Sequence, residues 1–313
     1  MRPSTFSNNG EFFKGNLHTH STNSDGLLSP DLVCKKYKEK GYDFLCISDH
    51  FVGLYDYPIT DTTNYRESNF TTILGAEVHS GSMQNGEIWH LLAVGLPKDF
   101  KPSNSPNFIP SHDQETAANL AQRCRDSGAF VSIAHPQWSG LTLSDAETIE
   151  AAHCAEIYNH GCAVDSDRGD GAYLLDLLLS QGKKLNLIAT DDAHFKSSDF
   201  FGGWVEVKSE KNEPLSLLKS LKEGHFYSSQ GPKFFDLSIN REELNIETSP
   251  ISSAILVGYG SASLASHGDA MVRTKIRFPP GLERTNKTPW VRVVIIDENG
   301  RKAWTNPIWT NEI

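Results

Sequence analysis

Short, continuous apolar runs alternate with helical segments from residue 10 to about residue 228, and this alternation limits the possible folds more than any other feature. The runs read as buried strands, because apolar residues follow one another without the alternation of a half-exposed strand. Such strands favour parallel pairing, and repeated strand–helix units favour a parallel sheet or barrel. The expected strands are 44–48, 71–78, 88–96, 129–135, 155–159 and 185–190.

Helices are predicted between these strands by their end signals. Ser29 is a candidate N-cap, Pro30 suits the first helical position, and Gly41 ends the segment. Glycines also follow three later helical patterns, where they can adopt the left-handed conformation of a helix end. These further helices are expected at 113–127, 170–181 and 214–223.

The pattern changes near residue 229. Beyond it, short alternating or β-branched runs are separated by turn sequences, and no helical period is seen. We therefore predict two domains: a larger α/β domain over residues 1–228, and a small all-β, sandwich-like domain over residues 229–313.

Composition excludes several classes of protein. No run of about eighteen apolar residues occurs and the amino terminus lacks a secretory pattern, so we expect a cytoplasmic protein that does not enter a membrane. The net charge of −10 argues against binding to duplex nucleic acid. The five cysteines form no CxxC pair and mostly lie in apolar runs, which argues against disulfides and thiolate metal sites.

Two histidines separated by one residue, His18 and His20, give the first chemical signal, and Asp25 follows on the adjoining loop. In a strand, side chains two residues apart project from one face and can bind one ion. Alone this pattern is weak, because paired histidines are often ordinary surface or core residues.

Metal-binding residue types also recur within or just after the predicted strands. In a β/α barrel the carboxyl ends of the strands meet at one face, which would bring such residues into one site. Oxygen and nitrogen ligands without a thiolate suit zinc, manganese or iron. The nine candidate ligands are His18, His20, Asp25, His50, Glu77, His90, His135, Asp192 and His194.

Six segments in this order resemble the PHP (polymerase and histidinol phosphatase) superfamily of metal-dependent phosphoesterases. They are LHTHSTNSDG, ISDH, GAEVH, WHLLAVG, IAHP and TDDAH, and they span about residues 14 to 200. The segments FYSSQGPKFFDLSI and AWTNPIW resemble the branch that includes carbaryl hydrolase-type metallohydrolases. The resemblance implies a distorted (β/α)7 barrel followed by the small β domain.

The resemblance also implies two or three divalent ions, in three positions. His18, His20, Glu77 and Asp192 would hold the first, and Glu77 would bridge to a second. His90 and His135 would complete the second position, and Asp25, His50 and His194 would hold the third. No family ligand is missing. Asp191 departs from the serine of many relatives, and could alter the surroundings of the ligands or the preferred metal.

A trinuclear centre of this kind predicts a metal-bridging hydroxide that hydrolyses a small-molecule or nucleotide phosphate ester. The first alternative is a hydrolase of carboxylic or carbamic esters that uses the same centre. The second is a non-catalytic metal-bound interaction module, which missing ligands would have favoured.

Other residues have less certain roles. Glu77, Asp49 and His79 are the candidate catalytic residues: Glu77 as the bridge, Asp49 orienting a histidine, and His79 as a proton donor. Glu156, on a predicted strand, could line the cavity or have a structural role. The candidate substrate-binding residues, all in loops near the predicted strand ends, are Arg168, Lys196 and Trp138.

Overall fold

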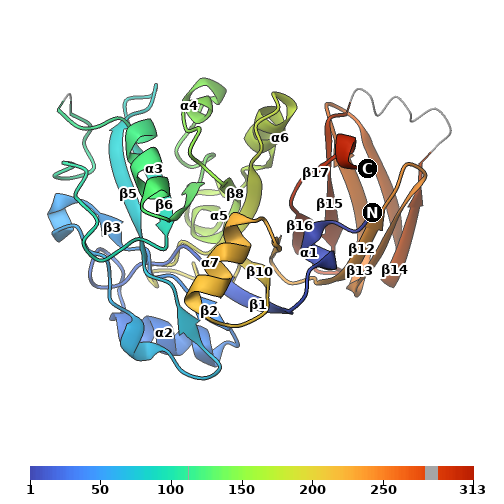
Figure 1. Cartoon of the computed structure of the whole chain (residues 1–313), viewed down its shortest axis with the longest axis horizontal. Coiled ribbons are helices and arrows are strands. Elements are labelled where there is room, and N and C mark those ends of the chain that lie inside the picture. Colours follow the sequence, from blue (N-terminus) through green and yellow to red (C-terminus); the bar gives the residue numbers. More distant parts are fainter. Residues whose placement is uncertain (112, 279–287) are drawn as a thin grey trace.

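The computed structural model describes residues 1–111, 113–278 and 288–313, and shows an α/β part beside a strand-rich carboxyl-terminal part (Figure 1). The predicted mixed α/β fold with a strand-rich carboxyl-terminal region is therefore confirmed. The strands are hydrogen-bonded in two sheets, and the predicted (β/α)7 barrel remains a prediction.

The smaller sheet carries much of the predicted chemistry and has six strands. Their order is β3 (His50–Phe51), β5 (Gly75–Ser82), β6 (Ile88–Val94), β7 (Phe130–Ile133), β8 (Cys154–Asn159) and β9 (Asn186–Thr190).

The larger sheet has eleven strands. Its main path is β12 (Phe234–Ile239), β13 (Glu243–Gly258), β15 (Trp290–Ile296), β16 (Lys302–Thr305), β11 (Phe226–Ser229), β10 (Trp204–Ser209), β1 (Glu11–Asn16), β2 (Phe44–Leu45) and β4 (Thr71–Thr72), while β14 (Ser263–Arg277) pairs with β13 and β17 (Ile308–Trp309) pairs with β15.

The expectation of parallel strands is only partly right. Strand β7 runs parallel to β8 and β8 to β9, as do β1, β2 and β4. By contrast, β6 is antiparallel to both β5 and β7, and β10 is antiparallel to β1 and β11. The connection from β5 to β6 is a short turn, which joins antiparallel neighbours and leaves no room for a crossover helix.

Four of the seven α-helices in the described residues match the four predicted segments. They are α2 (Pro30–Glu39), α3 (Ala117–Asp126), α6 (Ala172–Ser180) and α7 (Pro214–Lys222). The predicted segments were longer by up to four residues at an end. Helices α1 (Ser4–Ser7), α4 (Leu143–Glu147) and α5 (His160–Ser166) are too short to show a clear apolar period. None of the described helices is long and apolar enough to span a membrane.

Strands beyond residue 228 continue the larger sheet instead of forming a separate one. Strand β16 pairs with β11, which spans the predicted boundary. At the other end of the chain, Phe6 of α1 packs in the apolar cluster of the carboxyl-terminal strands, beside Phe234 and Leu237. The amino terminus accordingly lies beside that region in Figure 1. The division at 228/229 and the sandwich arrangement remain predictions, and the structure adds that residues 1–7 pack with the later strands.

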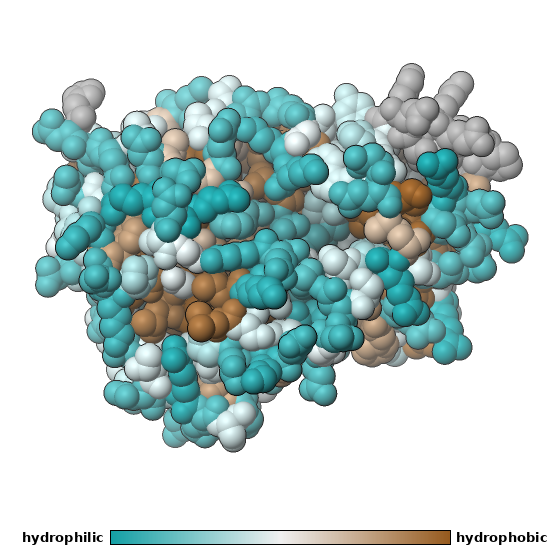
Figure 2. Space-filling model, in the orientation of Figure 1, coloured by the Kyte–Doolittle hydropathy of each residue, from teal (hydrophilic) through white to brown (hydrophobic). Residues whose placement is uncertain are grey.

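The two parts also share a core and an ion pair. Val294 of β15 and Trp304 of β16 belong to the same apolar cluster as Leu175 and Leu178 of α6. Beside it, the guanidinium of Arg292 donates two hydrogen bonds of 2.8 Å to the carboxylate of Asp176, also on α6. The face of the molecule in Figure 2 is mostly hydrophilic, and apolar side chains gather on it near α7, where Leu215 is exposed.

Replacing Arg292 with methionine tests this connection. The Arg292 side chain is buried, so its removal leaves the Asp176 carboxylate without its partner. We expect the free energy of unfolding to fall by about 2 kcal/mol, because breaking a buried pair costs more than breaking an exposed one. Urea denaturation measures the change. Lys35→Met, which removes an exposed helical pair with Glu39, is the control, with an expected loss of about 0.5 kcal/mol or less. Equal losses in both variants would contradict the role of Arg292.

Candidate metal centre

All nine predicted ligands lie together, and His79 joins them. Their candidate ligand atoms form four overlapping groups, and within each group the atoms lie within 4.8 Å of one another. The groups are His18 with His20 and Asp192; His18 with Glu77 and His135; His50 with Glu77, His79 and His90; and His20 with Asp25, His50 and His194.

The first group is built where β1 ends beside β9. His18 and His20 lie just after β1 rather than within it, in an extended segment that bridges to Ala193 at Thr19. The Nε2 atoms of both histidines lie 3.1 Å from Oδ1 of Asp192. The backbone N–H of Asp192 donates to the carbonyl of His18, which fixes the two segments together. The spacing of the two histidines therefore converges on one point, as predicted.

Glu77 occupies the centre of the cluster. It lies on β5 with His79 on the same face, while Ala76 and Val78 point into the apolar core. Oε1 of Glu77 lies 2.8 Å from Nδ1 of His90 and 3.1 Å from Nε2 of His135.

The other oxygen of Glu77, Oε2, faces the remaining histidines. It lies 2.7 Å from Nδ1 of His50, and 3.5 and 3.6 Å from Nε2 of His18 and His20. The Glu77 carboxylate thus lies within 3.6 Å of at least one histidine from each of the four groups. A carboxylate that bridges two ions would have such a central position.

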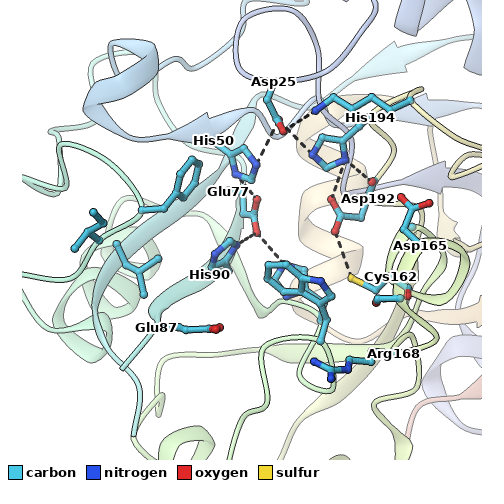
Figure 3. Close-up of a pocket in the computed structure, with 18 of the residues that line it drawn as sticks. Asp25, His50, Glu77, Glu87, His90, Cys162, Asp165, Arg168, Asp192 and His194 are labelled. Carbon is cyan, nitrogen blue, oxygen red and sulfur yellow. Dashed lines mark hydrogen bonds and ion pairs between the residues drawn. The ribbon is translucent and has the colours of Figure 1, made fainter. Parts of the chain in front are cut away.

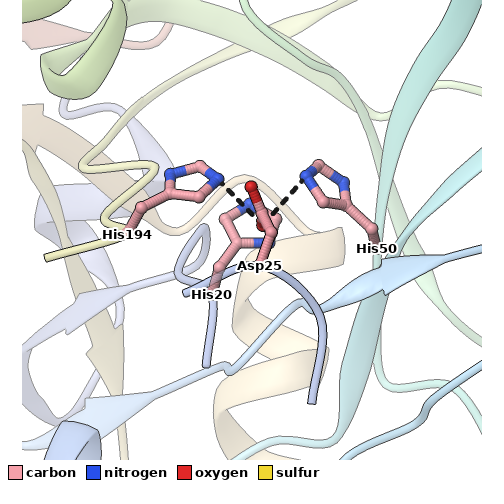
Figure 4. Close-up of side chains that lie close together, drawn as sticks. All are labelled: His20, Asp25, His50 and His194. Atoms are coloured by element: carbon pink, nitrogen blue, oxygen red, sulfur yellow. Dashed lines mark ion pairs between the residues drawn. The ribbon is translucent and has the colours of Figure 1, made fainter. Parts of the chain in front are cut away.

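The third predicted position lies around Asp25 (Figure 4). Its Oδ1 is 3.2 Å from Nε2 of His194 and 3.4 Å from Nε2 of His50. His20 also belongs to this group, which the predicted assignment gave only to the first position. His50 contacts Glu77 with one nitrogen and Asp25 with the other, so its ring lies between the centre and this third group.

The electrostatics of the cluster lower the pKa of Glu77, and they raise the pKa of His18 while lowering that of His20 and His90. Burial alone would raise the pKa of Glu77, but neighbouring histidines, led by His50 and His90, hold it well below its usual range. Burial would lower the pKa of His18, but the carboxylates of Asp192 and Glu156 raise it. Divalent cations bind where carboxylates are ionised and can replace protons on histidine.

Several buried atoms in the cluster also fit a metal better than a hydrogen bond. His18 Nε2, Asp25 Oδ1, Glu77 Oε2 and His79 Nδ1 have no acceptable hydrogen-bond partner among the described residues. Even so, Oε2 of Glu77 lies 3.5 Å from Nε2 of His18 and 2.7 Å from Nδ1 of His50, and Oδ1 of Asp25 lies 3.4 Å from Nε2 of His50. Close approach without hydrogen-bond geometry is expected where lone pairs are directed at a shared cation, so the residues present fit divalent ions.

A buried carboxylate behind the cluster orients its ligands. Glu156, whose role the sequence left open, accepts hydrogen bonds from Nδ1 of His18 at 2.8 Å and from the backbone N–H of His135 at 2.6 Å. Asn159 donates one hydrogen bond to Glu156 and one to Asp192. Such bonds fix the tautomer and direction of a metal-binding histidine, and the position of Glu156 on a predicted strand was the only sequence signal for them.

Two candidate ligands have unusual backbone conformations. The φ angles of His135 and Asp192 are 24° and 56°, although neither residue is glycine. Close to Asp192, a Cβ at Gly161 would lie 2.9 Å from the Asp192 carbonyl oxygen, so glycine allows α5 to start there. Strained conformations at positions that the surrounding structure fixes are typical of functional sites.

Asp49 and Asp191 are buried but lie away from the ligand atoms. Asp49 accepts hydrogen bonds from Ser21, Ser24 and Thr60. Among the described residues, it reaches a histidine only through Ser24, whose Oγ is 3.5 Å from Nδ1 of His20. Direct orientation of a histidine by Asp49 is therefore not what the structure shows.

Asp191 accepts hydrogen bonds from Tyr37 and from the backbone N–H groups of Phe201, Gly202 and Gly203. The Asp191 carboxylate therefore fixes the loop that follows His194 in the chain, and it does not point toward the candidate ligand atoms.

The ligand groups open into a pocket of about 820 Å³, which Arg168, Lys196 and Trp138 all line. Lys196 is not free, since its Nζ lies 3.0 Å from Oδ2 of Asp25. In the view of Figure 3, Arg168 lies toward the opposite end of the pocket from Asp25. Phe108 and Cys162 also line the pocket, and neither had a sequence signal.

Comparison with known proteins agrees with this geometry. The PHP domain family matches residues 16–165. A two-domain protein from Bacteroides vulgatus that contains a predicted PHP-like metal-dependent phosphoesterase superposes with a TM-score of 0.53 at 16% identity, over 95% of each chain.

An amidohydrolase from Chromobacterium violaceum with bound sulfate and no metal gives a TM-score of 0.40 at 14% identity, over 57% of this chain and 87% of that one. No curated protein matches the sequence. The PHP match covers the segments of His18, Glu77 and His135. The Bacteroides vulgatus protein shares the fold along nearly the whole chain. The chain therefore contains a region, residues 16–165, that matches the PHP domain family.

Proposed function

We propose that this protein is a metal-dependent phosphoesterase that hydrolyses a small-molecule or nucleotide phosphate ester at a trinuclear centre. The observation that carries the proposal is the buried Glu77 carboxylate, whose two oxygens lie within 3.1 Å of nitrogens from His50, His90 and His135. A single carboxylate shared in this way suits neighbouring divalent ions better than it suits a set of separate ion pairs.

Zinc, manganese or iron would be held as the ligand types suggest. The first ion would take His18, His20, Glu77 and Asp192; the second Glu77, His90 and His135; and the third Asp25, His50 and His194, with His20 nearby. Bound divalent ions would lower the pKa of water and stabilise the negative charge that develops in phosphoryl transfer.

The residues of this chain would prepare that chemistry. Glu156 holds Nδ1 of His18, which leaves Nε2 directed at the cluster. Ser139 does the same for His135, with Oγ 2.9 Å from Nδ1. His79, fully buried with Nε2 3.0 Å from Nδ1 of His50, is the candidate proton donor to the leaving oxygen.

Arg168 is the better of the two candidate phosphate-binding cations. Its side chain has no hydrogen bond or ion pair with any part of the chain that the structure describes, whereas Lys196 already contacts Asp25. A free guanidinium can bind phosphate with two parallel hydrogen bonds.

A hydrolase of carboxylic or carbamic esters, as in the carbaryl hydrolase-type branch, is the second candidate. One observation favours it: Phe108, Ile109, Pro110 and Trp138 give the pocket an apolar side, which suits an uncharged ester. A non-catalytic module would bind metal and hydrolyse neither kind of ester.

Metal analysis tests the centre directly. We expect at least two equivalents of divalent metal in wild-type protein saturated with zinc or manganese, measured by elemental analysis after gel filtration. His18→Ala combined with His20→Ala should lose at least one equivalent, because both side chains contribute to the first position. His225→Ala is the control, since His225 lies beside Asn8, outside all four ligand groups, and should keep the full amount. Fewer than two equivalents in the wild-type protein would contradict the proposal.

The neighbours Asp191 and Asp192 offer a matched pair. Asp192→Asn should lose metal, because the substitution removes the charged carboxylate that would share the first ion position with His18 and His20. Asp191→Asn should keep metal and lower the free energy of unfolding by about 1–3 kcal/mol, because an amide cannot accept all the hydrogen bonds of the carboxylate. Elemental analysis and urea denaturation separate the two effects. Loss of metal from Asp191→Asn alone would overturn the assignment.

Turnover of nitrophenyl substrates distinguishes the candidate functions. We expect the metal-loaded protein to hydrolyse nitrophenyl phosphate or bis-nitrophenyl phosphate faster than nitrophenyl acetate, with chelation abolishing the activity. Arg168→Met should raise KM for the phosphate substrate about tenfold, as loss of a charge-assisted contact predicts. Faster hydrolysis of the acetate would favour the second candidate, and hydrolysis of none would favour the non-catalytic module.

A further inference from the structure

Two aromatic side chains from separate loops flank the candidate second ion position. The ring of Phe108 lies 6.2 Å from that of His90 with an interplanar angle of 17°, and 4.9 Å from that of His50. The indole of Trp138 lies 5.6 Å from the ring of His90 and 4.8 Å from that of His135. His90 thus has two aromatic neighbours among the residues that line the pocket.

Both aromatic residues lie close in sequence to residues that are hydrogen-bonded to the backbone of the site. Ser103 and Ser105, shortly before Phe108, donate hydrogen bonds of 2.8 and 2.7 Å to the backbone carbonyl of His79. Trp138 lies in the turn after β7, where the backbone N–H of Ser139 donates to the carbonyl of His135. Their positions are therefore tied to the same strands that carry the candidate ligands.

The two side chains remain accessible. Trp138 is 40% exposed, Phe108 is half-buried, and both line the pocket. Large aromatic groups that are left partly uncovered beside the candidate ligands leave apolar surface for a ligand to bury. With about 820 Å³, the pocket also has room for much more than a phosphate group.

We infer that Phe108 and Trp138 form an aromatic clamp that selects esters with a planar aromatic leaving group. The inference rests on the proposed function, because the scissile group would sit at the ligands between the two rings. A flat aromatic group gains from stacked or edge-to-face contact with each ring, beyond the gain from burying apolar area. A saturated ring of equal size buries similar area without that gain, so the clamp distinguishes planarity from size.

The charges of the pocket agree with a neutral leaving group. Outside the candidate ligands, the pocket is lined by Glu87 and Asp165 and by Arg168 and Lys196, so charges of both signs are present there. An extended polyanion would meet Glu87 and Asp165, and a polyhydroxylated group would leave the two aromatic faces without apolar contact. A planar, uncharged group avoids both costs.

Binding of phosphonates to the metal-loaded full chain tests the clamp without turnover. Phenylphosphonate, cyclohexylphosphonate and ethylphosphonate share the phosphonate head group and differ in planarity and size. Isothermal titration should show phenylphosphonate binding about fivefold or more tighter than cyclohexylphosphonate, as expected for two aromatic contacts. Phe108→Leu and Trp138→Leu should each remove most of this preference, measured as the ratio of the dissociation constants of cyclohexylphosphonate and phenylphosphonate.

Two further variants guard against misfolding as the cause. Trp138→Phe should keep most of the preference, because it keeps an aromatic face. Tyr173→Leu, which removes a 78% exposed aromatic residue on α6, should leave binding of all three probes unchanged.

The outcomes separate the clamp from the proposed function. Equal binding of phenylphosphonate and cyclohexylphosphonate, or an undiminished preference in both leucine variants, would overturn the clamp and leave the phosphoesterase standing. Failure of all three phosphonates to bind the metal-loaded protein would contradict the phosphoesterase itself, and the clamp with it.

Discussion

The buried carboxylate of Glu77 is the interaction on which the arrangement of the site depends. An ionised carboxylate without compensation would be very costly at a fully buried position. Here the compensation comes from histidines on several different segments, including those of His18, His50, His90 and His135. Because these segments are far apart in the sequence, the site can form only when the strands that carry them are in place. The cluster and the smaller sheet therefore require each other.

The sequence predicted the members of this cluster better than the sheets that position them. Most candidate ligands lie in or just after a recognisable apolar run, and metal-binding side chains at the ends of strands are informative whichever way the strands pair. Strand direction was harder to predict: β6 reads as a buried parallel strand but is antiparallel to both neighbours. A continuous apolar run indicates that both faces of the strand are buried. Because a strand can be buried on both faces whichever way its neighbours run, the run does not predict strand direction.

Other features could not be predicted because they depend on contacts between distant residues. The left-handed conformations of His135 and Asp192, and the packing of Phe6 with the last strands, have no local sequence pattern. Phe108 lies in a segment between β6 and α3 that has no hydrophobic period. For Asp49 and Asp191 the sequence was misleading in another way. Both are adjacent to candidate ligands in sequence, but their carboxylates accept hydrogen bonds from loop residues instead. Proximity in sequence identifies candidates, while the direction of the side chain decides their role.

The carboxyl-terminal strands support the site from the side away from the pocket. Glu156 and Asn159, which hold His18 and Asp192, lie on β8, and Tyr158 between them stacks on Trp304 of β16 at 6.0 Å. Asn306, just after β16, accepts a hydrogen bond from the backbone N–H of Leu187 on the neighbouring strand β9. The register of β8 shifts between Glu156 and Tyr158, so the strand departs there from the regular alternation of its side chains. The strand-rich region thus contributes to the geometry of the metal centre, although none of the candidate ligands comes from it.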